Sequence, residues 1–174
     1  MSSRGSYGGL KIWLVAAVTS VALSGCIADA ASGVTTAVIE KLFEEGPTEI
    51  YAQIEAESDI NPDADGVPSP LVVRMYQLKS PTAFNNATFF ALYDSDTAEL
   101  GEDLKGKEEL ELQPGQKLEL ERELAPEVRF VGFIAGYRDI DNATWRAVAE
   151  VEEGSSTDIT IAIKRLDFKI VEVD

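Results

Sequence analysis

The sequence predicts an antiparallel β-sandwich that follows a leader and a short tether. Three observations predict this fold class. Apolar and polar residues alternate in several short segments, as they do in strands that bury one face. Clusters of Gly, Pro, Asn and Asp separate these segments and are typical of turns. About eight such segments follow one another without an internal repeat, which is the pattern of a sandwich.

Residues 1–25 have the organisation of a secretory signal. Arg4 and Lys11 form a basic start, and residues 12–23 are an almost uninterrupted apolar run. This run is short for a membrane span, which needs about 20 apolar residues. Ser24 and Gly25 are small, as a signal peptidase requires before its cleavage point. An uncleaved anchor helix is the alternative interpretation.

The leader ends in Leu23-Ser24-Gly25-Cys26, which resembles a bacterial lipobox. In a lipobox the cysteine thiol takes a diacylglycerol, and cleavage leaves that cysteine as the first mature residue. Cys26 is the only cysteine of the chain, so lipidation leaves no free thiol and no disulfide. Two acyl chains hold a protein firmly to a membrane. Ile27 stands where an aspartate commonly signals inner-membrane retention, so we expect the periplasmic face of the outer membrane.

Composition excludes several classes of function. The chain has 15 Lys+Arg, 31 Asp+Glu and a net charge of −16, which repels nucleic acid and anionic lipid headgroups. It has no histidine, which removes Ser-His-Asp and Cys-His catalysis and His-ligated zinc. A hydrolase that uses two carboxylates remains a distant alternative. We therefore expect no enzyme, no cofactor and no metal.

The tether covers residues 26–47. Residues 27–33 are small and polar, and residues 34–45 predict a short amphipathic helix that Gly46-Pro47 ends. Its apolar face consists of Val34, Val38, Ile39, Leu42 and Phe43. This helix packs on the domain, on the membrane or on a partner, and its acidic opposite face disfavours anionic lipid.

The sandwich domain is expected over residues 48–174. Its first strand begins at Glu49 and turns Ile50, Ala52, Ile54 and Ala56 inward. The second strand covers residues 71–78. Six more strands are predicted at residues 110–112, 118–120, 128–137, 145–151, 159–163 and 168–173. The strand at 128–137 is apolar on both faces and should be central.

One helix is predicted after the second strand. Ser80 is its expected N-cap and Pro81 its first residue. Phe84, Thr88 and Leu92 share one face of it. The acidic segment that follows, beginning with Asp94-Ser95-Asp96, is interpreted as a solvated turn. Further on, Gln113-Pro114-Gly115-Gln116 predicts a type II turn.

Residues 61–70 form the connection between the first two strands, and they are rich in Pro, Asp and Gly. The simple interpretation is a turn. The sharper one is a protruding binding loop that Pro62, Pro68 and Pro70 stiffen, which lowers the entropy lost on binding. The segment begins like a calcium-binding EF-hand loop, but Val72 stands where that motif needs a glutamate. We therefore predict no calcium site.

Four blocks of the domain, in order, resemble the type VI secretion outer-membrane lipoprotein family, TssJ. They are residues 61–80, residues 84–93, residues 112–115, and residues 131–140 followed by Trp145-Arg146. No block is diagnostic alone, but four in order behind a lipobox are specific. The resemblance implies a transthyretin-like sandwich of two antiparallel sheets with a short inserted helix. The helix at 34–45 departs from the family, whose tether is usually a plain linker.

The resemblance also implies a non-enzymatic role. The family anchors the secretion membrane complex to the outer membrane by holding the periplasmic C-terminal domain of the inner-membrane protein TssM. In the family the loop between the first two strands contributes to partner binding. The partner-binding residues implied here are Asn61, Pro62, Asp63, Ala64, Asp65, Gly66, Val67 and Pro68. The alternative is an envelope lipoprotein that binds a small ligand or chaperones other envelope proteins, for which a closed apolar pocket is expected.

Overall fold

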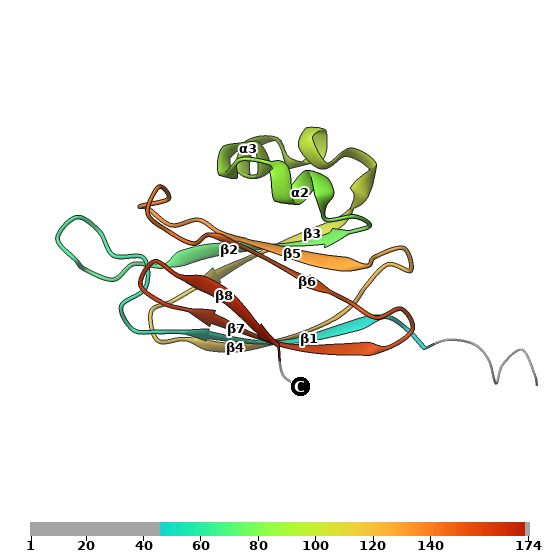
Figure 1. Ribbon diagram of the computed structural model, residues 1–174. Coiled ribbons are helices and arrows are strands. Elements are labelled where there is room, and N and C mark those ends of the chain that lie inside the picture. The colour runs from blue at the N-terminus through green and yellow to red at the C-terminus, as the bar shows by residue number, and fades with distance from the viewer. Residues whose placement is uncertain (1–45, 173–174) are drawn as a thin grey trace, which may run out of the picture. The chain divides into compact units, whose positions relative to one another are not determined.

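Two four-stranded sheets form the domain in this computed structural model, which describes residues 46–172 (Figure 1). The first sheet has the strand order β4-β1-β7-β8 and the second β3-β2-β5-β6. The strands are β1 (Glu49–Ala56), β2 (Leu71–Leu78), β3 (Leu104–Leu112), β4 (Lys117–Glu123), β5 (Phe130–Ala135), β6 (Arg146–Glu150), β7 (Ser156–Ile163) and β8 (Phe168–Glu172). The predicted sandwich is confirmed. The leader, Cys26 and the helix expected at 34–45 lie outside the described residues.

The main core lies between the sheets and follows the predicted alternation. Ile50 and Ile54 of β1 are fully buried, as are Phe133 of β5 and Phe168 of β8. The rings of Phe133 and Phe168 lie 6.3 Å apart and join the two sheets. Burying each such side chain contributes about 1.5–3 kcal/mol. The core is therefore filled by side chains of both sheets, and β5 is a central strand as predicted.

One strand pair departs from the antiparallel expectation. β1 runs parallel to β7, whereas every other pair within the two sheets is antiparallel. The spacing of turns reports only on strands that follow one another along the chain. Since five strands separate β1 from β7 along the chain, the spacing of turns could not predict their relative direction.

The helical insertion predicted after β2 is confirmed, but the segment forms two helices instead of one, α2 (Thr82–Asn86) and α3 (Phe89–Leu100). Both cover the outer face of the second sheet (Figure 1). Thr88 is not on a helix face but is the N-cap of α3, where its hydroxyl accepts a hydrogen bond from the Ala91 N–H at 3.2 Å. Because the backbone of Thr88 is extended, with a ψ of 162°, the first helix ends before this residue and the second begins after it. Phe84 and Leu92 are fully buried against the sheet.

Asp96 is not part of a solvated turn, because α3 continues through it. Its side chain is buried, and the Lys107 ammonium donates to its carboxylate at 2.6 Å. Burial raises the pKa of Asp96, but hydrogen bonds from Lys107 and Thr97 outweigh it, and the net pKa lies below its usual value. The helix is kinked at Ser95, whose φ is −142°.

The predicted type II turn is present between β3 and β4. The Gln116 N–H donates to the Gln113 carbonyl at 3.0 Å, and Gly115 has the positive φ of 78° that this turn requires. Among residues 46–172, no helix combines the length and the apolar character needed to cross a bilayer.

Candidate partner-binding surface

The connection between β1 and β2 protrudes from one end of the sandwich (Figure 1). Its base is buried: Asn61 is 3% exposed, Ser69 is 8% exposed, and Pro62 is buried as well. Residues 64–68 form an exposed tip, on which the Val67 side chain is 56% exposed. The predicted loop thus has a base that is buried in the domain and a tip that is exposed to solvent.

Asn61 fixes the base of the loop. Its side-chain amide donates to the Pro70 carbonyl at 2.6 Å and accepts from the Arg138 N–H at 2.8 Å. Its own N–H donates to the Arg165 carbonyl at 3.1 Å. Asn61 has a φ of 47°, a left-handed conformation that asparagine tolerates better than most residues. One residue therefore joins the loop to two other parts of the chain.

Asp63 shapes the tip. One of its carboxylate oxygens accepts hydrogen bonds from the N–H groups of Asp65 and Val67, at 3.0 and 2.9 Å. The Asp63 N–H also donates to the Val67 carbonyl at 2.9 Å. Gly66 supplies a φ of 82° within this turn. The carboxylate thus organises its own loop, and within residues 46–172 no three acidic side chains gather as a metal site would require.

Two neighbouring connections lie beside the loop: residues 136–145 between β5 and β6, and residues 164–167 between β7 and β8. The Thr144 N–H donates to the Leu166 carbonyl at 2.9 Å. The buried Tyr137 hydroxyl donates to the Lys164 carbonyl at 3.1 Å, and burial raises the pKa of Tyr137. Together with Asn61 these bonds unite residues 61–70, 136–145 and 164–167 into what we call the three-loop surface.

A hollow of about 480 Å³ opens on the three-loop surface. Pro62, Asp63 and Ala64 line it from the first connection, Arg138 and Asp139 from the second, and Arg165 and Leu166 from the third. The sequence identified the first group but missed the second and third. No local pattern marks them, because long-range hydrogen bonds bring these segments together.

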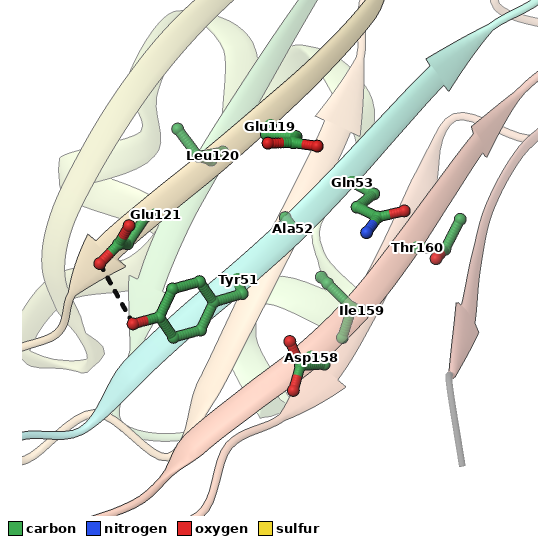
Figure 2. Close-up of a pocket in the computed structure, with 9 residues that line it drawn as sticks. All are labelled: Tyr51, Ala52, Gln53, Glu119, Leu120, Glu121, Asp158, Ile159 and Thr160. Atoms are coloured by element: carbon green, nitrogen blue, oxygen red, sulfur yellow. Dashed lines mark hydrogen bonds between the residues drawn. The ribbon is translucent and has the colours of Figure 1, made fainter.

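A larger hollow, of about 640 Å³, lies on the outer face of the first sheet (Figure 2). Its lining includes Tyr51 and three acids, Glu119, Glu121 and Asp158. The Tyr51 hydroxyl lies 3.1 Å from a Glu121 oxygen and 3.3 Å from a Glu49 oxygen and can donate its one proton to either. These carboxylates, Glu121 first, raise the pKa of Tyr51 to about 12. The hollow is open and acidic, unlike the closed apolar pocket expected of a ligand carrier.

Residues 48–166 match the family model described as type VI secretion lipoprotein, VasD, EvfM, TssJ. The crystal structure of the T6SS lipoprotein TssJ1 from Pseudomonas aeruginosa is 38% identical, with a TM-score of 0.71, and the match covers 74% of this chain and 98% of that one. None of the curated proteins matches the chain.

Two further solved structures are similar. Serratia marcescens Lip, described as a membrane-bound component of the type VI secretion system, is 26% identical with a TM-score of 0.68, covering 72% of this chain and 99% of that one. A chain in a structure described as the C-terminal domain of the T6SS protein TssM from EAEC is 27% identical with a TM-score of 0.62. That match covers 72% of this chain and 99% of the other.

Proposed function

This chain belongs to the type VI secretion lipoprotein family that includes TssJ, and we propose that it anchors the type VI membrane complex to the outer membrane. The observation that carries the proposal is the family match over residues 48–166, which covers nearly the whole described domain. The role is mechanical and non-catalytic. One end of the molecule is held by lipid and the other grips a protein that crosses the periplasm.

The lipid end is Cys26. The lipobox that ends in this residue supports diacylglycerol attachment, and the two acyl chains provide firm membrane binding. Ile27 after the cysteine supports delivery to the outer membrane. The surface of the chain, with 31 acids against 15 bases, is a poor ligand for anionic headgroups, so the attachment depends on the lipid.

The protein end is the loop of residues 61–70, and its partner is the periplasmic C-terminal domain of TssM. A chain similar to this one occurs in a structure whose description names that domain of TssM. The loop is suited to binding because its hydrogen bonds hold the tip in one conformation before a partner arrives, which reduces the entropy lost on association. Val67 gives this tip an apolar contact group.

Fractionation of cells tests the lipid end. The change Cys26→Ser removes the thiol that accepts the lipid, so the protein should leave the outer-membrane fraction. An unchanged distribution contradicts the anchor model.

Binding to the purified TssM domain tests the protein end. Deleting residues 63–67 should weaken capture while the fold persists, since these residues lie outside the strands. The point variant Val67→Asp should weaken capture as well. Its matched control is Val171→Asp, because Val171 of β8 is similarly exposed, at 52%, but lies outside the loop. Equal capture by both aspartate variants and wild type rules out the tip as the contact.

A further inference from the structure

The arginines of the domain divide into two groups. Arg74, Arg122, Arg129 and Arg146 each donate hydrogen bonds from the guanidinium group to carboxylates or carbonyls of the same chain. Within residues 46–172, Arg138 and Arg165 are the two whose guanidinium groups make neither a hydrogen bond nor an ion pair. Both are exposed, and both line the hollow of the three-loop surface. Their donors are therefore available to another molecule.

The backbone holds both arginines at the base of the partner-binding loop. The Arg138 N–H donates to the Asn61 side chain at 2.8 Å, and the Arg165 carbonyl accepts from the Asn61 N–H at 3.1 Å. The two residues are far apart in sequence, but the backbone of each is hydrogen-bonded to the same buried residue, Asn61. Their positions are thus fixed relative to the loop, while their side chains extend into solvent.

The carboxylates that line the same hollow accept hydrogen bonds from their own loops. Asp63 accepts two hydrogen bonds from the tip of its own loop. Asp139 accepts from the Asn142 amide through both carboxylate oxygens, at 2.9 and 3.1 Å. These carboxylates lower the net charge of the hollow, but they leave the guanidinium donors unpaired. What the hollow can bind therefore depends on the directional hydrogen bonds of these two guanidinium groups more than on the net charge of the hollow.

We propose that the hollow of the three-loop surface binds a carboxylate-bearing segment of the protein partner, with Arg138 and Arg165 as the donors. The proposal rests on the proposed function, since the partner is the TssM domain held by the loop. A guanidinium group matches a carboxylate geometrically and gives strong charge-assisted hydrogen bonds. The rest of the chain is acidic and repels an acidic segment. Such a segment therefore docks here and in one orientation.

Titration of the TssM domain against the domain of this chain, at several salt concentrations, tests the proposal. The variants are Arg138→Glu, Arg165→Glu and the double change. The matched control is Lys79→Glu with Lys105→Glu, which alters net charge equally at two exposed residues outside the hollow. Each arginine variant should raise Kd about tenfold or more, because each loses a charge-assisted contact. The double variant should also lose part of the salt dependence, and the control should bind like wild type.

The outcomes separate this inference from the function on which it rests. If wild type itself does not bind the TssM domain, the proposed partner is wrong. If wild type binds and the arginine variants match the lysine control, the hollow is not the contact and the inference is overturned while the function stands. Restored binding of Arg138→Glu to a TssM domain with one acid changed to lysine identifies the carboxylate. Unfolding of each variant serves as a check, and should be unchanged because neither guanidinium bonds within the domain.

Discussion

Asn61 should be the residue whose loss most damages the three-loop surface. The change Asn61→Ala removes two side-chain hydrogen bonds and strands the Arg138 N–H and the Pro70 carbonyl at a site where residue 61 is 3% exposed. Each buried group left without a partner costs about 1–3 kcal/mol. Alanine also tolerates the φ of 47° poorly, because its Cβ approaches the following carbonyl. We expect a total loss of about 2–4 kcal/mol.

Thermal unfolding measures this loss. At roughly 4 °C per kcal/mol for a domain of this size, Tm should fall by about 8–16 °C. The variant Asn61→Gly loses the same hydrogen bonds but accepts a positive φ, so it should unfold at or above the temperature of Asn61→Ala. Asn142→Ala is the control, because Asn142 lies in the neighbouring turn but is exposed, and it should change stability by about 0.5 kcal/mol or less.

Two results refute the reasoning. If Asn61→Ala unfolds together with the Asn142→Ala control, the two side-chain hydrogen bonds of Asn61 do not hold the surface together. If Asn61→Ala is clearly more stable than Asn61→Gly, the left-handed backbone is not a source of cost at this position.

Two other predictions concern the side of the domain that carries the helices. The pKa of Asp96 is lower in the folded state than its ordinary value of 3.8, so its carboxylate stabilises the fold above that pH and this contribution disappears as pH falls further. Urea unfolding from pH 7 to pH 2 should therefore show that the free energy of unfolding falls less steeply with acid for Asp96→Asn than for wild type. Parallel curves for the two proteins contradict a stabilising role of the Asp96 carboxylate. The change Gly132→Ala places a Cβ 2.8 Å from the buried ring of Phe84 and should destabilise the domain by about 1–3 kcal/mol. Gly115→Ala is not a suitable control because its φ is 78°, whereas Ser156→Ala at an exposed strand position should be nearly neutral in the same urea assay.

Local patterns in the sequence predicted the strands well, because alternation reports directly on burial. Ile50, Ala52, Ile54 and Ala56 all face the core as expected. The same reasoning failed at Thr88, since a capping threonine and a helix-face threonine look alike until the neighbouring N–H groups are placed. It also failed at Asp96, whose partner Lys107 lies on β3.

The candidate site was predicted only in part, and for the same physical reason. The 61–70 loop carries its own signature of Pro, Asp and Gly, so the sequence reveals it. The contribution of Arg138 and Arg165 depends on bonds from Asn61 to segments far along the chain. Arg138 lies within a block that resembles the family, but no local pattern marks it or Arg165 as part of a binding site. Only the fold shows that these two share a hollow with the loop.

The position of the loop relative to β1 bears on how the proposed anchor carries load. The chain reaches β1 at Glu49, and the loop follows the opposite end of that strand (Figure 1). With 8 residues at about 3.3 Å each, β1 separates these points by about 26 Å. In the proposed anchor, tension between lipid and partner would run along β1, which pairs over its length with β4 and β7. Because β1 is already extended, its covalent backbone would carry this tension with little lengthening, and the ladders with β4 and β7, including the parallel pair that the sequence did not predict, hold the strand in its sheet.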